Sequence, residues 1–271
     1  MPELPEVEVV RLGLEPLLSG QMIVEVKCFR EGLRYPFPDF SSLTAQHFTS
    51  VQRRAKYLLF RLDGPEVLIW HLGMTGQFHV VPVSQEKTKH EHARFVLSNG
   101  NAMIYRDPRR FGYVGLLPAD TWASHVWFSN LGVEPLQDAF TGEYLFQLTR
   151  QRKAPIKQVL MDASVVVGIG NIYASESLFR ARIHPATAAC RISGARIQRL
   201  VTSVRTVLGE ALEAGGSTIS DFVHVDGKPG YFAHDFRVYG RDGKACRLCS
   251  TPIRKLVQAG RSTFYCPICQ H

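Results

Sequence analysis

Four cysteines near the end of the chain constrain its folding more than any other residues. They form two CxxC pairs separated by sixteen residues, Cys246 with Cys249 and Cys266 with Cys269. This spacing is typical of a zinc ribbon, in which each pair forms a knuckle and the segment between them folds back as a hairpin. An iron–sulfur site or two redox pairs are the alternatives, but two regular pairs in a short basic module favour zinc. One Zn2+ held by four thiolates has no open coordination position, so we expect a structural ion.

The residues from about 57 to 105 show a β pattern. Apolar runs occupy residues 57–62, 67–71, 95–97 and 102–105. Turn sequences separate them, Asp63-Gly64-Pro65 and Asn99-Gly100, because asparagine, aspartate and glycine tolerate positive φ. We therefore expect an antiparallel sandwich or barrel in this half of the chain.

After about residue 135 the apolar residues repeat at helical spacing. The longest run lies between Ile197 and Leu212, with Ser193 as a candidate N-cap and Gly215-Gly216 as the stop. Shorter helical runs cover residues 142–150, 155–161 and 172–179. Gly168 and Gly170 precede the last of these runs, where they either bring backbone N–H groups close to an anion such as a DNA phosphate or simply form a tight turn.

Composition narrows the class of partner. The chain has 271 residues, of which 45% are hydrophobic, which suits two domains and a small appendage. Its formal net charge is +8, and residues 228–271 hold eight basic side chains against two acidic ones, a net charge of +6. A basic surface at one end suits a polyanion such as nucleic acid, although basic proteins of other kinds are common.

The sequence contains no recognisable targeting or membrane segment. Four glutamates within the first twenty residues exclude a secretory signal, and no apolar stretch is long enough to cross a bilayer. We therefore expect a soluble, cytoplasmic protein whose cysteines stay reduced. The isolated Cys28 and Cys190 are then core or incidental residues.

Pro2 is the residue with the most unusual chemistry. The initiator methionine is normally removed before proline, which leaves Pro2 with a free secondary amine. An α-amino group titrates near ~8 against ~10.4 for lysine, so part of it is nucleophilic at neutral pH. Attack on a sugar or carbonyl carbon gives a cationic iminium, with Glu3 as a neighbouring acid. The alternative is a helix start with Pro5 at its first position and acidic residues facing its dipole, which leaves Pro2 unexplained.

Several motifs together resemble one family. They are Met-Pro-Glu-Leu-Pro-Glu-Val-Glu at residues 1–8, Gln-Arg-Arg-Ala-Lys-Tyr at 52–57, His-Leu-Gly-Met-Thr-Gly at 71–76, Asp-Pro-Arg-Arg-Phe-Gly at 107–112, Gly-Ile-Gly-Asn-Ile-Tyr-Ala at 168–174 and the four cysteines. In this order they resemble the bacterial formamidopyrimidine-DNA glycosylases from Pro2 to Cys269. The related endonuclease VIII branch usually has a glycine where this chain has Leu4.

The resemblance implies an α+β multidomain protein. An N-terminal antiparallel β-sandwich is expected over residues 1–134, a C-terminal helix-two-turn-helix domain with a lesion loop over 135–236, and a zinc finger over 237–271. The implied activity is that of a bifunctional glycosylase and AP lyase, which removes 8-oxoguanine and formamidopyrimidines from damaged double-stranded DNA. We expect a monomer in the bacterial cytoplasm, acting on the nucleoid.

Roles for individual residues follow from the same resemblance. Pro2 would attack C1′, Glu3 would act as the acid on the sugar ring, Lys56 would serve β-elimination, and Arg261 would serve δ-elimination and phosphate binding. The family's DNA-contacting positions correspond to His90, Arg109, Lys153 and Asn171. Met74, Arg109 and Phe111 resemble its void-filling set, although Met74 and Phe111 would otherwise be expected in the core. Residues 217–231 have the length of a lid, expected to close over an extruded base.

Two other classes of function stay open at this point. A non-catalytic DNA-binding module would explain the charge and the cysteines but not a free N-terminal proline. A small-molecule enzyme that uses Pro2 as a base, in the manner of tautomerases, would explain the proline but not the basic tail.

Overall fold

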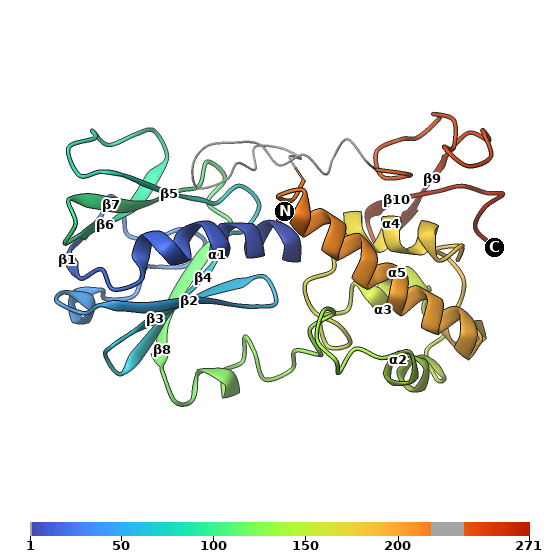
Figure 1. Ribbon diagram of the computed structural model, residues 1–271, viewed down its shortest axis with the longest axis horizontal. Coiled ribbons are helices and arrows are strands. Elements are labelled where there is room, and N and C mark those ends of the chain that lie inside the picture. The colour runs from blue at the N-terminus through green and yellow to red at the C-terminus, as the bar shows by residue number, and fades with distance from the viewer. Residues whose placement is uncertain (1, 218–235) are drawn as a thin grey trace. The chain divides into compact units, whose positions relative to one another are not determined.

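The structure, a computed structural model, describes residues 2–217 and 236–271, which form two compact units (Figure 1). The first unit contains residues 2–129 and 214–217, and the second contains residues 130–213 and 236–271. Apart from Ser217, the segment expected to form a lid lies outside the described residues. No helix among the described residues is long and apolar enough to cross a membrane.

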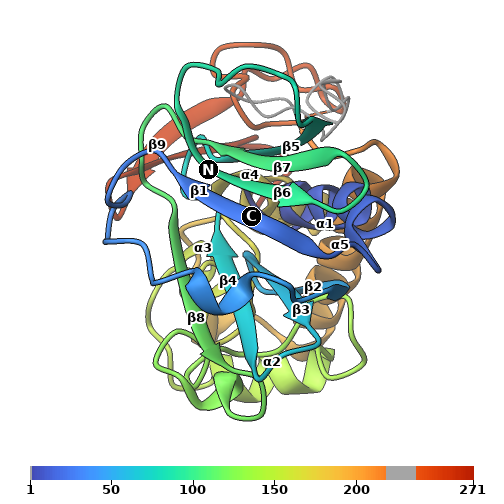
Figure 2. The ribbon, with the colours of Figure 1, turned by 90° about the vertical axis from the view of Figure 1, so that its left-hand side faces the viewer.

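The first unit is built on two four-stranded sheets, which Figure 2 shows together. One sheet has the order β1 (Ile23–Cys28), β6 (Glu91–Leu97), β7 (Asn101–Arg106) and β5 (Gln77–Pro82). The other has the order β2 (Phe48–Arg54), β3 (Tyr57–Leu62), β4 (Glu66–His71) and β8 (Tyr113–Pro118). Every neighbouring pair is antiparallel. The predicted antiparallel sandwich is confirmed.

Large aromatic side chains from both sheets form the core of this unit. The ring of Trp70 on β4 lies 4.6 Å from that of Tyr105 and 6.2 Å from that of Phe95, both on the opposite sheet. Phe60 and Phe78 make a second contact between the sheets at 5.4 Å. All five side chains are buried, so the sheets are joined by close packing of large apolar surfaces.

The helix α1 (Leu4–Leu18) packs on this sandwich through one face. Val7, Val10, Leu14 and Leu18 repeat at helical spacing and belong to the same buried cluster as the sheet residues. This packing fixes α1 on the sandwich, and Pro2 lies two residues before the first residue of this helix.

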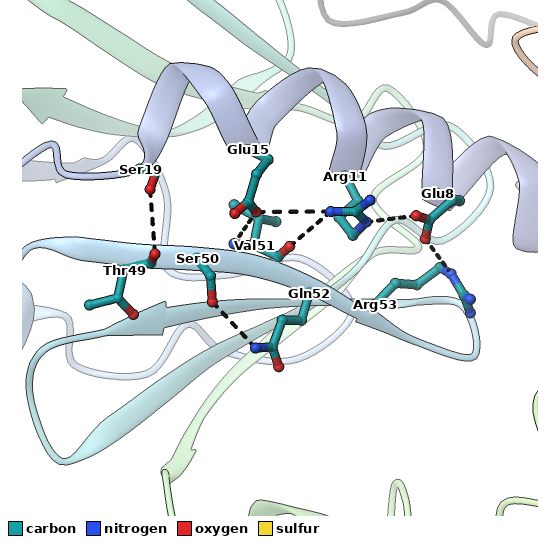
Figure 3. A network of polar contacts seen from close by, with 9 residues as sticks. All are labelled: Glu8, Arg11, Glu15, Ser19, Thr49, Ser50, Val51, Gln52 and Arg53. Atoms are coloured by element: carbon teal, nitrogen blue, oxygen red, sulfur yellow. Dashed lines mark hydrogen bonds and ion pairs between the residues drawn. The ribbon is translucent and has the colours of Figure 1, made fainter.

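A network of hydrogen bonds and ion pairs joins polar side chains of α1 to β2 (Figure 3). Glu15 Oε2 accepts the backbone N–H of Val51 at 2.5 Å. Glu8 accepts Arg11 Nε through one oxygen and Arg53 Nε through the other, each at 2.7 Å. Arg53 also donates to the carbonyl of Ala55 at 2.9 Å. The start of α1 is therefore bonded to the turn between β2 and β3.

The second unit is mainly helical, as the periodicity predicts. Its helices are α2 (Gly142–Thr149), α3 (Ile156–Leu160), α4 (Asn171–Arg180) and α5 (Gly194–Glu213). α4 contacts α3, α5 and the strand β10 (Arg261–Tyr265), and its residues 172–179 are all buried. α5 begins directly after Ser193 and ends before Gly215 and Gly216, both of which have positive φ. Three short 3-10 helices complete the described chain, η1 (Ser41–Leu43), η2 (Trp122–Ser124) and η3 (Ala189–Arg191).

The cysteine module of the second unit is a hairpin flanked by the two CxxC pairs. Its strands are β9 (Arg254–Gln258) and β10 (Arg261–Tyr265), joined through Ala259 and Gly260, which both have positive φ. Glu176 on α4 accepts the N–H groups of residues 237, 238 and 239 at 2.8 to 3.0 Å. Burial raises the pKa of Glu176, while these three N–H groups favour its charged form. One buried carboxylate thus fixes the start of the module on α4.

Candidate functional site

Two glutamates hold the start of α1. Glu3 is the N-cap residue and is buried, and its backbone N–H donates to Glu6 Oε2 at 2.8 Å. Glu6 Oε1 accepts both the N–H of Ser217, at 2.9 Å, and the Ser217 hydroxyl, at 2.7 Å. Leu4 is the first helical residue, so the expectation of Pro5 at the first position is wrong by one residue. The half-buried Pro2 therefore precedes a helix end that is fixed by reciprocal capping.

Lys56 lies in the two-residue turn between β2 and β3, to which Arg53 donates a hydrogen bond. Ala55 has a φ of +55°, which reverses the chain, and Lys56 is half-buried before Tyr57 opens β3. The Lys56 charge acts on the ring of His71 at the end of β4. The sequence predicts that Lys56 lies where a sheet meets a basic surface, and the structure places it directly before the first residue of β3.

A cavity of about 880 Å³ in the first unit brings the expected void-filling residues together. Met74, Arg109 and Phe111 all line it. The Arg109 guanidinium carbon lies 4.8 Å from the centroid of the Phe111 ring, and Phe111 is 46% exposed. The core placement that composition alone favours is therefore wrong for Phe111 and for the half-buried Met74.

His71 lines the same cavity and was not among the site residues expected from the sequence. Its ring stacks on Tyr113 with centroids 4.8 Å apart, and its Nδ1 accepts the N–H of Gly73 at 3.1 Å. Burial, together with the smaller effects of the Lys56 and Arg34 charges, lowers the pKa of His71 to about 4. A neutral ring thus lies among cations. The available signal was its position at a strand end, separated by Leu72 alone from Gly73-Met74.

His90 and Lys153 are both exposed. His90 has a φ of +64°, and its carbonyl accepts the N–H of Asp107 at 3.1 Å. This bond places His90 beside the loop that carries Arg109 and Phe111. Lys153 lies in the second unit, between α2 and α3.

Asn171 is part of a polar cluster in the second unit. It is the first residue of α4, and its amide donates to the carbonyl of Ser262 at 2.9 Å. Lys157, which is 1% exposed, donates to Asn171 Oδ1 at 2.5 Å and to Thr263 Oγ1 at 2.7 Å. Arg261 is exposed, begins β10 next to these residues, and lines a cavity of about 190 Å³ together with Lys157. The structure therefore brings the predicted Asn171 and Arg261 together.

The link between them, Lys157, was missed by the sequence analysis. A lysine within a helical run normally faces solvent, so the sequence offers no local signal for its burial. Its role here is positional, because its bonds join α3, α4 and β10.

The four cysteines meet the requirements of one zinc ion. Their sulfur atoms all lie within 4.8 Å of one another, with Cys249 and Cys266 at 3.4 Å and Cys246 and Cys269 at 4.0 Å. Tetrahedral coordination with Zn–S bonds of ~2.3 Å requires sulfur separations of about 3.8 Å. Backbone N–H groups of Leu248 and Cys269 donate to the sulfurs of Cys246 and Cys266, as zinc knuckles require. The predicted structural zinc site is confirmed.

Comparison with protein families assigns most of the chain. Residues 1–114 match the formamidopyrimidine-DNA glycosylase N-terminal domain, residues 131–223 match the formamidopyrimidine-DNA glycosylase H2TH domain, and residues 243–271 match the zinc finger found in FPG and IleRS. The formamidopyrimidine-DNA glycosylases of Janthinobacterium sp. (strain Marseille) and Yersinia enterocolitica are 49% and 48% identical to this chain. In both cases the similarity covers 100% of each protein.

Solved structures agree with these matches. The MutM (FPG) protein of Thermus thermophilus superposes with a TM-score of 0.89 at 39% identity, covering 99% of this chain and 98% of its own. A single-residue mutant of the Lactococcus lactis FPG, solved with DNA containing Fapy-dG, superposes with a TM-score of 0.93 at 32% identity over 100% of both chains.

The environment of His71 predicts a pH dependence for the stability of the first unit. Unfolded histidine titrates near ~6.5, so between pH 6.5 and 4 the unfolded state binds a proton that the folded state rejects. Stability should therefore be fully present above pH 6.5 and fall by roughly 2 to 3 kcal/mol as the pH drops to 4. All three tryptophans, Trp70, Trp122 and Trp127, lie in this unit, so tryptophan fluorescence during urea unfolding reports it selectively.

His71→Phe is the matched variant, because it keeps a ring against Tyr113 and removes the titration. It should be less stable at pH 7, since the N–H of Gly73 loses its acceptor, but should lose less stability between pH 6.5 and 4. Equal losses in the two proteins over this pH range would show that His71 is not held neutral.

Proposed function

The chain belongs to the formamidopyrimidine-DNA glycosylase family of base-excision repair glycosylases and AP lyases, and we propose that Pro2 is its nucleophile. Family membership removes the two alternatives that the sequence left open, a non-catalytic DNA-binding module and a tautomerase. The observation that carries the proposal is the capped start of α1. Glu6 accepts hydrogen bonds from Glu3 and Ser217, so Pro2, which directly precedes Glu3, is held at a defined place. Defined placement is what a nucleophile requires.

The proposed reaction starts at the amine of Pro2 after removal of the methionine. Its lone pair attacks C1′ of the damaged nucleotide, the glycosidic bond breaks, and the base leaves with the proton that the amine gives up. The C1′–O4′ bond of the sugar then breaks as the nitrogen lone pair forms a double bond to C1′. Because the amine is secondary, the resulting C1′=N+ iminium keeps its charge without holding a proton. Loss of a C2′ proton then expels the 3′ phosphate, and a second elimination expels the 5′ phosphate.

Three side chains assist these steps in the proposal. Glu3, buried next to Pro2, gives a proton to the ring oxygen of the sugar as the ring opens. Lys56 accepts a proton during β-elimination, and the Glu8 and Arg53 bonds hold its turn against α1. Arg261 binds the phosphate that leaves in δ-elimination, because its planar fork can bond two phosphate oxygens.

The proposed substrate is duplex DNA that carries an oxidised purine, 8-oxoguanine or a formamidopyrimidine. A base in a duplex is out of reach of a chain terminus until the nucleotide is rotated out, at a cost of a few kcal/mol. Met74, Arg109 and Phe111 line one cavity and offer a flexible apolar chain, a hydrogen-bonding cation and an aromatic wedge to fill the vacated stack. His90, Lys153 and Asn171 hold the phosphate backbone, which positions the protein without reading sequence.

We further propose that the chain has three domains. Residues 1–134 form the β-sandwich domain with Pro2, Glu3 and Lys56, residues 135–236 form the helix-two-turn-helix domain, and residues 237–271 form the zinc finger with Arg261. The protein acts as a monomer in the cytoplasm, on DNA of the nucleoid.

Blocking the Pro2 amine tests the nucleophile. A form with a few residues added before Pro2 should lose both base release and strand cutting on 8-oxoguanine duplexes, because an amide nitrogen has no free lone pair for attack. The control is the same preparation after a protease has removed the extension and exposed Pro2, which should recover activity. Full strand cutting by the extended form would rule out the Pro2 amine.

The zinc hairpin is predicted to act through Arg261. Arg261→Ala should keep one zinc per chain yet weaken lesion-DNA binding about tenfold to a hundredfold, the effect of losing a charge-assisted bond pair. Arg254→Ala, which removes the same charge from the other strand of this hairpin, should have a much smaller effect. Chelation of the metal should mimic Arg261→Ala by unfolding the hairpin.

Zinc content and DNA affinity should be measured on the same preparation. Full affinity of zinc-free protein, or equal effects of the two arginine substitutions, would show that the hairpin contributes only stability or general charge.

A further inference from the structure

Asp107 is a buried carboxylate that no step of the proposed reaction uses. It follows β7 directly and has no exposed surface. Its Oδ2 accepts the N–H of Gly112 at 2.9 Å and lies 3.4 Å from the Tyr105 hydroxyl. Its carbonyl accepts His92 Nε2 at 2.9 Å and the N–H of Arg110 at 3.2 Å. The last residue of the loop 107–112, Gly112, is thus bonded back to its first residue, Asp107.

The second oxygen of Asp107 reaches a different loop. Oδ1 accepts the hydroxyl of Thr75 at 2.5 Å, and Thr75 is itself buried. The same Thr75 oxygen accepts the backbone N–H of Arg109 at 3.2 Å. Thr75 therefore bonds the loop of Met74 to the backbone of Arg109. Asp107 accepts the hydrogen bond of the Thr75 hydroxyl and so orients its oxygen toward Arg109.

Backbone contact between these loops leaves them little freedom. A Cβ atom on Gly73 would lie 2.3 Å from the backbone nitrogen of Gly112 and 2.4 Å from the carbonyl carbon of Phe111. Neither loop can therefore move toward the other, and the hydrogen bonds of Asp107 prevent them from separating. Met74, Arg109 and Phe111 project from this joined pair into one cavity.

We infer that Asp107 is a positioning residue that couples the loops 72–76 and 107–112, so that Met74, Arg109 and Phe111 enter the duplex as one rigid element. This inference rests on the proposed void-filling role of those three residues. The physical reason is preorganisation: three side chains on independent loops would each lose conformational entropy on insertion, whereas a preformed element loses little. A carboxylate suits the task, because its two oxygens bond both loops at once.

The coupling should matter most for a step that needs a base pushed out of the stack. An abasic site has no base to extrude, so cutting at an abasic site depends less on insertion. Asp107→Asn offers one acceptor oxygen in place of two, and Thr75→Val keeps the shape of threonine without its hydroxyl. Both should slow 8-oxoguanine release about tenfold or more in single-turnover assays, and abasic-site cutting several-fold less than that. Thr75→Ser, which keeps the hydroxyl, should restore most of the rate.

A double-substitution cycle separates coupling from simple destabilisation. If Thr75 and Asp107 act through Arg109, Thr75→Val should slow base release strongly in the native background and little in the Arg109→Ala background. Fluorescence of 2-aminopurine opposite the lesion should show less unstacking in Thr75→Val at saturating protein.

The possible outcomes have distinct meanings. If Thr75→Val and Asp107→Asn release the base at rates within threefold of the native rate while Arg109→Ala is slow, the coupling is overturned. The proposed function would then stay intact. Equal slowing of base release and abasic-site cutting, or additive effects in the cycle, would reduce Asp107 to a stability element and also overturn the coupling. Unchanged base release in Arg109→Ala would instead overturn the void-filling role, and the coupling with it.

Discussion

The buried carboxylate of Glu6 is the interaction that organises the proposed site. Its two oxygens accept hydrogen bonds from the backbone of Glu3 and from the backbone and hydroxyl of Ser217, and the side chain is 2% exposed. A buried carboxylate is costly unless donors satisfy it, so these partners are held firmly once the unit folds. Because Pro2 directly precedes Glu3, the same bonds fix the residue proposed to attack DNA. The apolar face of α1 and the Glu8 and Arg53 bonds then fix this helix on the sandwich.

Buried charged side chains also hold the other functional segments in place. Asp107 holds the loop with Arg109 and Phe111, Glu176 holds the start of the zinc module, and Lys157 holds Asn171 against β10. In each case a buried charged group bonds two or more segments distant in sequence. Such groups contribute positional specificity, since loss of one partner leaves a buried charge without its donor or acceptor. The exposed side chains proposed to meet DNA are thus carried by segments whose backbone is fixed from inside.

Elements that depend on local patterns can be predicted from this sequence, whereas features that depend on long-range contacts cannot. The turns at Asp63-Gly64 and Asn99-Gly100, the helix after Ser193 and the cysteine hairpin follow from periodicity and turn chemistry, and the structure confirms them. The strands β1, β2, β5 and β8 were not predicted, because they are partly exposed and lack the continuous apolar runs on which the other strands were predicted. The burial of Lys157 and the neutral His71 depend on residues far away in sequence, so no local pattern reveals either. Residue roles such as those of Lys56 and Arg261 came from resemblance, and remain predictions.

If catalysis starts at the amine of Pro2, the covalent intermediate with DNA is attached to that nitrogen, and mass spectrometry can locate it. The enzyme would be incubated with 8-oxoguanine duplex, reduced with borohydride, digested with nuclease and protease, and analysed by tandem mass spectrometry. A sugar remnant is expected on the nitrogen of Pro2, in the peptide that begins with Pro2 and Glu3. A remnant on Lys56 or on any other internal lysine, with the Pro2 nitrogen unmodified, would contradict attack by Pro2.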